Sequence, residues 1–246
     1  MRFTKVSIII PVYNEEKYIK KTIERVINSN SLKLRKEIIV VDDGSTDSTP
    51  KILNAFHRKV NSSTSMSIFI LYKKENEGKG SAIREGLRKV TGDIIIIQDA
   101  DLEYNPKDYP SLIEPFINAN AQVVYGSRTL GMKVFGNQYS SLLYYLGGRL
   151  LTFCVNILYK VNLTDQPTGY KLFTSELVPI ILKQTQEKDF SYEIEMTALF
   201  SKKRHKIVEV PVTYKPRTKN EGKKIKFPDF IKAISVGLRW KLINGN

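Results

Sequence analysis

The chain has 246 residues, of which 41% are hydrophobic and 26% are charged, so the sequence predicts a globular protein and excludes a disordered one. Its formal net charge of +14 indicates an anionic partner, such as a phosphorylated substrate, an anionic lipid or nucleic acid. One cysteine excludes a disulfide within the chain and favours a reducing compartment.

The first half of the chain alternates short β-branched runs with segments whose apolar residues are spaced three or four apart. Such runs predict buried strands, and such spacing predicts helices. We expect strands at 6–10, 38–41, 68–72, 94–97 and 122–125, and helices at 15–26, from 48, at 79–90 and at 106–118. This alternation predicts an α/β fold with a mostly parallel central sheet and helices on both faces.

The second half is less regular. It predicts a long apolar helix at 140–159, helices at 175–183 and 192–200, a strand-like run at 207–214 and an amphipathic helix at 227–242. We expect Gly147-Gly148-Arg149 to interrupt the long apolar segment before it reaches the roughly 18 residues of a spanning helix. Residues 202–246 contain thirteen Lys or Arg against three acidic residues, so much of the positive charge lies at the C-terminal end.

Three acidic residues follow the strand of four isoleucines at 94–97. Asp99, Asp101 and Glu103 stand at alternate positions, where like charges repel and raise each other's pKa. A divalent cation removes this cost, and hard oxygen ligands suit Mg²⁺ or Mn²⁺. The sequence therefore predicts a metal site at Asp99, Asp101 and Glu103, and a solvated acidic turn is the alternative.

Polar motifs follow four of the predicted strands. They are Pro11–Glu15, Asp42–Ser45, Asp99–Glu103 and Gly126–Arg128. In open α/β sheets, ligands bind beyond the carboxyl ends of the strands. We therefore expect these four loops to meet at one edge of the sheet and to form one site.

Several motifs together resemble those of family 2 glycosyltransferases, in particular the dolichol-phosphate mannose synthases and related polyprenyl-phosphate sugar synthases. The motifs are Pro11-Val12-Tyr13-Asn14-Glu15, Val41–Asp47, Asp99-Ala100-Asp101, Gly126-Ser127-Arg128, Asp165–Tyr170 and Glu209–Tyr214 with Arg217 behind it. The resemblance covers nearly the whole chain and implies the Rossmann-like GT-A fold. It implies a catalytic domain at 1–215. The basic segment at 216–246 that follows is amphipathic, from which we expect contact with a membrane surface. Burial of its apolar face against the protein's own core is the alternative.

The resemblance also implies roles for individual residues. Residues that would bind the nucleotide sugar are Pro11, Tyr13, Glu15, Val41, Asp43, Asp99, Ala100, Arg128, Arg217, Lys223 and Lys224. Asp101, Arg128 and Arg149 would be catalytic, with Arg149 facing a lipid phosphate. Glu103 departs from the mannose synthases, in which this position is often Gln, and its extra charge would tighten metal binding or change the metal preference.

The expected function is the inverting transfer of a hexose, with mannose favoured, from GDP-mannose or UDP-glucose to a polyprenyl phosphate of the dolichyl type. The resemblance implies peripheral attachment to the cytosolic face of a membrane, with a membrane-protein partner as a further expectation. The first alternative is transfer to a sugar or lipid hydroxyl, for which Glu193 or Glu195 would act as base. A basic nucleic-acid-binding module is a remote alternative, because it leaves the three acids unexplained, and we expect no nucleic-acid partner.

Overall fold

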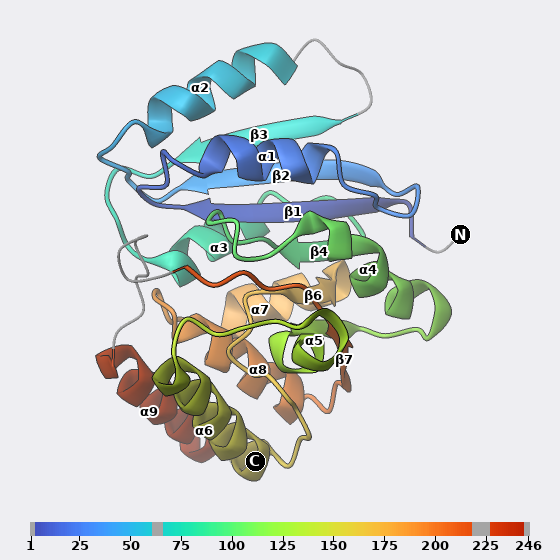
Figure 1. Ribbon diagram of the computed structural model, residues 1–246, viewed down its shortest axis with the longest axis vertical. Helices are drawn as coiled ribbons and strands as arrows, with labels where there is room; N and C mark the ends of the chain where they lie inside the picture. Colours follow the sequence, from blue (N-terminus) through green and yellow to red (C-terminus); the bar gives the residue numbers. More distant parts are fainter. Residues whose placement is uncertain (1–2, 61–65, 218–226, 244–246) are drawn as a thin grey trace.

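The computed structural model describes residues 3–60, 66–217 and 227–243. Its centre is a seven-stranded sheet in the order β3-β2-β1-β4-β6-β5-β7 (Figure 1). The strands are β1 (Lys5–Val12), β2 (Arg35–Asp42), β3 (Ser67–Tyr72), β4 (Ile94–Ile97), β5 (Val123–Ser127), β6 (Lys171–Thr174) and β7 (Ile207–Pro211). Strand β6 is antiparallel to β4 and β5, and the other pairs are parallel. The predicted mostly parallel sheet is confirmed.

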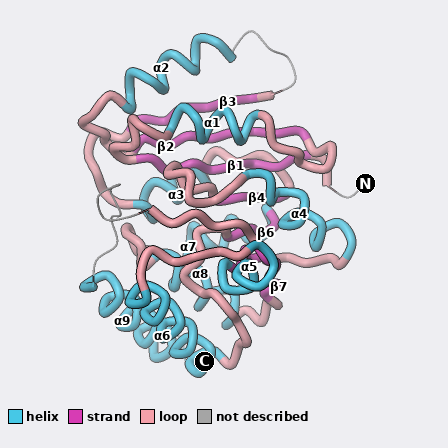
Figure 2. Tube along the Cα trace, in the orientation of Figure 1, coloured by secondary structure: helices cyan, strands magenta, loops and turns pink. Residues whose placement is uncertain are grey.

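Helices cover both faces of this sheet (Figures 1 and 2). They are α1 (Ile19–Ile27), α2 (Thr49–Val60), α3 (Lys79–Leu87), α4 (Tyr109–Asn118), α5 (Arg128–Phe135), α6 (Leu142–Tyr159), α7 (Val178–Gln184), α8 (Tyr192–Lys202) and α9 (Phe227–Ile243), with short 3₁₀ turns η1 (Pro106–Asp108) and η2 (Ser175–Leu177). Helices α1, α2 and α4 pack on one face, and α3, α7 and α8 pack on the other. Helices α6 and α9 lie side by side against α8.

The alternation of side chains along the strands explains the two cores. In β4, Ile94 and Ile96 pack with α1 and α4, whereas Ile95 and Ile97 pack with α3 and α8. All four side chains are at most 2% exposed, as expected for a strand with both faces covered. The run of isoleucines therefore places the following acidic residues at the end of a rigid, fully buried strand.

Two local predictions were wrong. The expected turn at Gly126–Arg128 is the end of β5 and the start of α5, and the Ser127 hydroxyl accepts a hydrogen bond from the backbone N–H of Leu130 as a helix cap. The long apolar helix expected at 140–159 is confirmed as α6, but Gly147-Gly148-Arg149 does not keep its apolar segment below spanning length, because the helix runs on through both glycines at a cost of only about 1 kcal/mol each. In the described part of the chain, α6 is the one helix long and apolar enough to cross a membrane.

The C-terminal helix α9 is partly integrated into the core. Ala233, Val236 and Trp240 are buried in the same cluster as residues of α6 and α8. The Trp240 indole N–H donates to Glu195 Oε1 at 3.0 Å, and the Tyr159 hydroxyl donates to the Gly237 carbonyl at 2.6 Å. The division of the chain at 215/216 stays a prediction.

Candidate active site

The loops that follow β1 and β2 are joined at the carboxyl edge of the sheet. The backbone N–H of Asn14 donates to the Ser45 hydroxyl at 2.9 Å, and the N–H of Glu15 donates to the Thr49 hydroxyl at 3.0 Å. Asn14 itself has φ of 50°, in the left-handed region that Asn tolerates. The two loops therefore hold Glu15 at the edge where the acidic loop after β4 also ends.

Arg217 ties the loops after β1 and β4 together. Its Nη1 lies 3.0 Å from Glu15 Oε2, and its Nη2 lies 2.8 Å from Asp101 Oδ2. Its backbone N–H donates to Glu103 Oε1 at 2.9 Å, and its guanidinium lies 5.5 Å from the centre of the Tyr18 ring. Burial disfavours the charged guanidinium, but Asp101, Glu15 and Glu103 outweigh burial and raise the pKa of Arg217.

Lys79 forms a second cationic bridge, between Asp99 and helix α8. Its ammonium lies 2.7 Å from Asp99 Oδ1 and 2.7 Å from Glu193 Oε1. Although burial opposes the charged form, the two carboxylates raise the pKa of Lys79 well above its ordinary value. Lys79 therefore holds a positive charge at the centre of the site.

These contacts allow the fit of a divalent metal to be tested. Five carboxylates contact the two cations just described, so among the described residues the acids of the cluster outnumber its cations; they are Glu15, Asp99, Asp101, Glu103 and Glu193. Burial and the repulsion of Asp99 and Glu103 raise the pKa of Asp101 to about 7, although Arg217 opposes this. Such a cluster of hard oxygen donors fits Mg²⁺ or Mn²⁺.

In the described structure, however, the acids face the cations. Among the described residues, no group of three His, Cys, Asp or Glu side chains is arranged to hold a metal ion. Asp99 is bonded to Lys79, while Asp101 and Glu103 are bonded to Arg217. A metal would therefore bind only after these acids turn away from Arg217 and Lys79.

Asp42 and Asp43 organise the loops that follow β2 and β3. Asp42 accepts a hydrogen bond from the backbone N–H of Ser45 at 3.0 Å. Asp43, which is 2% exposed, accepts from Lys73 Nζ and from the N–H of Gly78, each at 2.6 Å. Asp43 thus connects the loop after β2 to the start of α3, and its contact with a nucleotide stays a prediction.

The other predicted nucleotide-binding residues lie at the ends of the central strands. Pro11 and Val41 stand opposite each other in the pairing of β1 and β2, and the Val41 side chain is buried beneath α3. Ala100 is buried, and its carbonyl accepts from the Thr22 hydroxyl at 2.8 Å. Tyr13 is half-buried in the loop after β1. Lys223 and Lys224 lie outside the described residues.

Arg128 is bound by the loop at 165–170. Its Nε and Nη2 donate to the two oxygens of Asp165 at 2.8 and 2.7 Å, and Nη2 also donates to the Pro167 carbonyl at 2.8 Å. The guanidinium lies 5.2 Å from the Tyr214 ring centre and 5.8 Å from that of Tyr139. Arg128 is therefore a largely enclosed cation, and its Nε and Nη2 bind groups of the protein itself.

The same loop packs against the first acid of the metal motif. A Cβ at Gly169 would lie 2.2 Å from Asp99 Oδ2, so any other residue at position 169 would force the Asp99 carboxylate to move. The N–H of Gly169 donates to the Tyr104 hydroxyl at 2.7 Å. The loop at 165–170 therefore contacts Asp99 at one end and Arg128 at the other.

Arg149 lies on the exposed side of α6, close to this loop. Its Nη1 donates to the carbonyl of Thr164 at 3.1 Å, and Thr164 directly precedes the Asp165 that binds Arg128. Arg128 and Arg149 therefore bind two neighbouring residues, Asp165 and Thr164. This arrangement is compatible with the predicted phosphate contact of Arg149.

The two candidate bases differ in their surroundings. Glu193 is held by Lys79 at the site. Glu195 is 1% exposed and accepts hydrogen bonds from the backbone N–H groups of Gln186 and Glu187 and from the Trp240 indole. Burial raises the pKa of Glu195. Glu195 therefore fastens α9 to α8, and Glu193 is the acid that faces the site.

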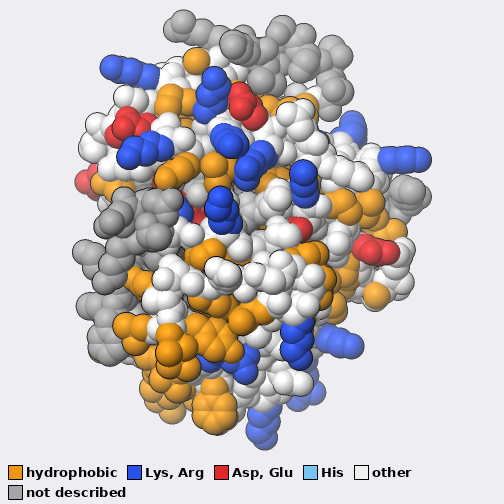
Figure 3. All heavy atoms as spheres, in the orientation of Figure 1, with side chains coloured by type: hydrophobic (Ala, Val, Ile, Leu, Met, Phe, Trp, Pro, Cys, Tyr) orange, Lys and Arg blue, Asp and Glu red, His pale blue; other side chains and the backbone are white. Residues whose placement is uncertain are grey.

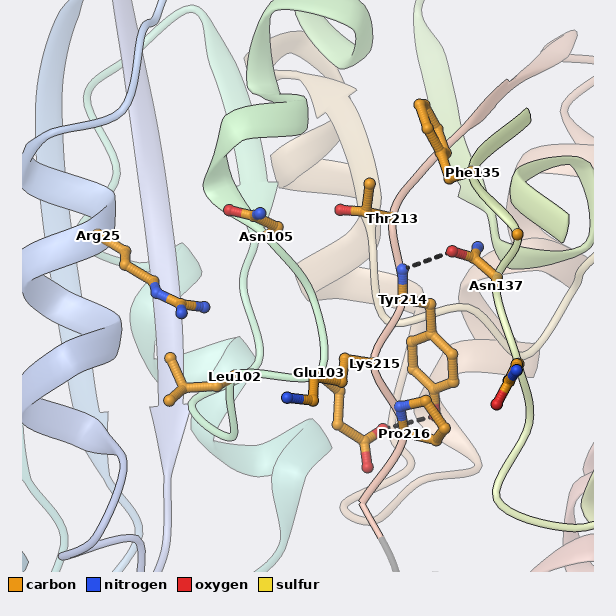
Figure 4. A pocket seen from close by; sticks show the side chains of 12 residues that line it. Arg25, Leu102, Glu103, Asn105, Phe135, Asn137, Thr213, Tyr214, Lys215 and Pro216 are labelled. Atoms are coloured by element: carbon orange, nitrogen blue, oxygen red, sulfur yellow. Dashed lines mark hydrogen bonds between the residues drawn. The ribbon is translucent and has the colours of Figure 1, made fainter.

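A cavity of about 420 Å³ lies beside the acidic cluster (Figure 4). It is lined by side chains from α1, the loop after β4, the end of α5 and the segment at 213–216. Glu103 lines it and accepts a hydrogen bond from the Tyr214 hydroxyl at 2.6 Å, but Asp99 and Asp101 are not among its described lining residues. The cavity thus adjoins the acidic cluster without containing it.

Sequence reasoning missed Lys79, Asp43's partner Lys73 and the contact between Gly169 and Asp99. The first two follow β3, which ends at the same edge as β1 and β2. The sequence Gly78-Lys79-Gly80 at the start of a helix was the available signal, because glycines permit close backbone approach near a bound ligand. The contact between Gly169 and Asp99 had no such local signal.

Comparison with known proteins gives one family. The model of "Glycosyl transferase family 2" matches residues 7–178. The chain is 30% identical over 217 residues to the UDP-N-acetylglucosamine–dolichyl-phosphate N-acetylglucosaminyltransferase of Methanococcus voltae, with 84% of each chain covered. It is also 30% identical over 225 residues to the dolichol-phosphate mannosyltransferase of Pyrococcus furiosus, covering 89% of this chain and 59% of that protein.

Solved structures agree on the fold. Glucosyl-3-phosphoglycerate synthase from Mycobacterium tuberculosis, in complex with UDP, superposes with a TM-score of 0.70 at 18% identity. The superposition covers 97% of this chain and 80% of the synthase. At this identity the likeness establishes the architecture, and the expected α/β fold is confirmed.

Proposed function

The chain belongs to glycosyl transferase family 2 and has its GT-A fold, and we propose that it transfers a hexose from a nucleotide sugar to a polyprenyl phosphate at a membrane surface. One observation carries this proposal. The acidic cluster around Asp101 and Arg217 lies at the same sheet edge as the loop that binds Arg128 and Arg149. A site for a metal-bound diphosphate thus adjoins two arginines that suit a second phosphate.

The donor end would be held by the acidic cluster. Asp101 and Glu103, with Asp99, would bind the metal, which offsets the charge that grows on the departing diphosphate. The structural neighbour has been crystallised with UDP and Mn²⁺ or Mg²⁺, which supports a divalent metal as the cofactor. Arg217 and Lys79, released from the acids, would neutralise the diphosphate oxygens, and such preorganised cations are often the largest catalytic contribution.

The acceptor is proposed to be a phosphate rather than a hydroxyl. A phosphate oxygen is already ionised, so it can attack the anomeric carbon while the bond from that carbon to the diphosphate breaks and the diphosphate takes the electron pair. A hydroxyl would need a base for its proton. Glu193, the acid that faces the site, is bonded to Lys79 at 2.7 Å. With a phosphate acceptor, Glu193 would have no proton to take, whether or not Lys79 turns toward the diphosphate.

The names of the relatives leave the sugar open among several hexoses. One relative is named for N-acetylglucosamine and another for mannose, and the structural neighbour is a glucosyl-3-phosphoglycerate synthase. We propose a hexose donor with GDP or UDP as the nucleotide. Mannose, favoured from the sequence, ranks equally with glucose and N-acetylglucosamine on these relatives.

Peripheral membrane contact is proposed for the face that carries α6 and α9. Figure 3 shows apolar side chains gathered in the lower part of the molecule, where these helices lie. The exposed apolar residues of α6 are Leu142, Leu143, Leu146, Leu150, Phe153 and Ile157, and those of α9 are Ile231, Leu238 and Leu242. The cytosolic face and a membrane-protein partner at this surface are part of the same proposal.

This face also suits anionic headgroups. Its described basic residues, Arg149, Lys232, Arg239 and Lys241, are exposed, and α6 contains no acidic residue. Lys232 and Arg239 also form ion pairs with Glu187, so Arg149 and Lys241 are the main candidates for headgroup contact. Each basic residue near an anionic leaflet contributes about 1 kcal/mol. The proposed membrane contact therefore rests mainly on α6, with α9 beside it, rather than on the C-terminal segment alone.

A panel of donors tests the proposed function. The purified chain would be incubated with GDP-mannose, UDP-glucose and UDP-N-acetylglucosamine, each with Mg²⁺ or Mn²⁺ and a polyprenyl phosphate. We expect one donor to give a glycosylated lipid phosphate at a rate far above the others. No lipid product with any donor would contradict the proposal.

A further inference from the structure

Lys171 is a buried lysine that the proposed reaction does not use. It begins β6, and its side chain is 1% exposed. Its ammonium donates to the carbonyls of Gln166 at 2.8 Å and Thr168 at 2.7 Å, and it lies 4.4 Å from the centre of the Tyr125 ring. Within the described part of the chain it forms no ion pair. Burial of an ammonium without a carboxylate partner costs folding free energy, so a lysine at this position calls for a functional explanation.

The carbonyls that Lys171 binds belong to the loop at 165–170. At one end of this loop, Asp165 and the Pro167 carbonyl bind Arg128. At the other end, Gly169 packs directly against the carboxylate of Asp99. The ammonium thus anchors the middle of a loop whose two ends touch the donor acid and the buried arginine.

We propose that Lys171 is a positioning residue for sugar transfer, because its ammonium fixes the loop at 165–170 and thereby the spacing between Asp99 and Arg128. This inference rests on the proposed function. A displacement of about 1 Å in a reacting group can cost roughly 100-fold in rate. Lys171 touches neither substrate nor metal ligand and acts through the backbone of the loop alone.

The charged groups around Lys171 have opposite effects on its pKa. Glu193 of α8 and Asp165 of the loop attract the ammonium, whereas Lys79 of α3 and Arg128 of α5 repel it. Burial is the largest influence, and it lowers the pKa of Lys171 to about 8. Charge-assisted hydrogen bonds are roughly twice as strong as neutral ones, so the hold on the loop weakens when pH rises through this value.

Lys36 offers a matched control. Its ammonium likewise binds backbone carbonyls, those of Val26 at 3.2 Å and Ser29 at 2.7 Å among them, and burial likewise lowers its pKa. It lies at the start of β2, at the opposite end of the sheet from the acidic cluster. A purely structural role for a carbonyl-binding lysine would therefore affect both positions alike.

The test compares Lys171→Met with Lys36→Met in kcat, donor KM and melting temperature. We expect Lys171→Met to lower kcat about 100-fold while donor KM changes by less than about threefold, because the loop is displaced but the nucleotide loops are not. We expect Lys36→Met to keep kcat within about twofold, whatever its melting temperature. A Lys171→Met protein that is folded and has the wild-type kcat would overturn the inference.

A second variant covers the case in which Lys171→Met does not fold. Lys171→Arg keeps a charged donor that does not titrate near pH 8. We expect the wild-type rate to fall as pH rises across about 8 and the rate of Lys171→Arg to stay level there. The same fall in both proteins would overturn the inference. A wild type without turnover on any donor would overturn the proposed function as well, whereas an active wild type with unaffected variants would overturn this inference alone.

Discussion

The guanidinium of Arg217 donates from Nη2 to Oδ2 of Asp101 at 2.8 Å, across 116 residues of sequence. Arg217 forms ion pairs with acids that a metal ion could otherwise bind, so a metal ion would compete with Arg217 for these carboxylates. Exchange of partners would keep both groups satisfied, because the carboxylate would gain the metal and the arginine would gain a phosphate. Arg217 and Lys79 thus offset part of the negative charge of these acids.

Replacement of Asp101 by Asn tests the metal assignment. We expect Asp101→Asn to lower turnover by at least about 10²–10³-fold, because a charge that holds the metal on the diphosphate is lost. EDTA should have the same effect on the wild type. Asp93→Asn is the control, since Asp93 precedes the same strand at its other end and accepts hydrogen bonds from Thr4 and Lys5. Full activity of Asp101→Asn in EDTA would rule out the metal-assisted reaction.

Arg149 and Glu193 separate a phosphate acceptor from a hydroxyl acceptor. If the acceptor is a lipid phosphate, Arg149→Ala should cripple lipid glycosylation but leave slow hydrolysis of the donor by water, because only the acceptor loses its cation. Glu193→Gln should then lower the transfer rate only modestly. If the acceptor is a hydroxyl, loss of the base should cost about 10²–10⁴-fold. Transfer and hydrolysis would be measured separately for both variants. A phosphate acceptor predicts that Arg149→Ala is the slower transferase, and a hydroxyl acceptor predicts that Glu193→Gln is. A nearly inactive Glu193→Gln would exclude the phosphate acceptor.

Membrane contact through α6 can be measured with vesicles. Burial of a Leu or Phe side chain contributes roughly 1.5–3 kcal/mol, so Leu146→Glu with Phe153→Glu should lower binding to anionic vesicles by at least about tenfold. Phe69→Glu is the control, because Phe69 is 47% exposed on β3, at the far edge of the sheet. Binding should also weaken with added salt. Equal loss for the α6 double variant and Phe69→Glu would count against this surface.

The sequence allowed much of the central sheet to be predicted. Strand β4 could be predicted because a run of four isoleucines is typical of a strand covered on both faces, as it is here. The acids after it were noticeable because carboxylates are unusual at the end of such a strand. The loops after β1 and β2 could be located for the same reason, since parallel strands end at one edge. The spacing of apolar residues and the position of turn-forming residues are local properties of the chain, and they are enough to locate these strands and the loops after them.

The long-range contacts could not be read from the sequence. Arg217 binds Glu15 across 202 residues, and Lys79 binds Glu193 across 114, so no local pattern links the partners. Helix α5 was missed because it begins within a motif that reads as a turn and contains Gly131. The buried face of α9 likewise depends on α6 and α8, because an amphipathic pattern does not say whether protein or lipid covers it.

Glu37 gives a prediction about stability rather than activity. It is 1% exposed and accepts from Lys5, Ser7 and Thr91 at the amino end of the sheet. Burial alone would raise its pKa, but these hydrogen bonds outweigh burial and lower it. Because the folded pKa is depressed, the stabilisation is present above the ordinary pKa of 4.5 and is lost as pH falls through the folded value.

Chemical unfolding at several pH values checks this. Glu37→Gln should lower the free energy of unfolding by about 2–3 kcal/mol at pH 7, and the difference should shrink in acid. The exposed Glu24→Gln should have little effect at either pH. A constant difference between wild type and Glu37→Gln across the acid range would contradict the assignment.

The central claim is that a polyprenyl phosphate accepts the sugar. The direct measurement uses the purified chain, its preferred nucleotide sugar and Mn²⁺ with either a polyprenyl phosphate or the matching polyprenol, and it detects the lipid products by mass spectrometry. We predict one added hexose or N-acetylhexosamine on the polyprenyl phosphate, none on the polyprenol, and no product in EDTA. Glycosylation of the polyprenol at an equal or higher rate would contradict the account.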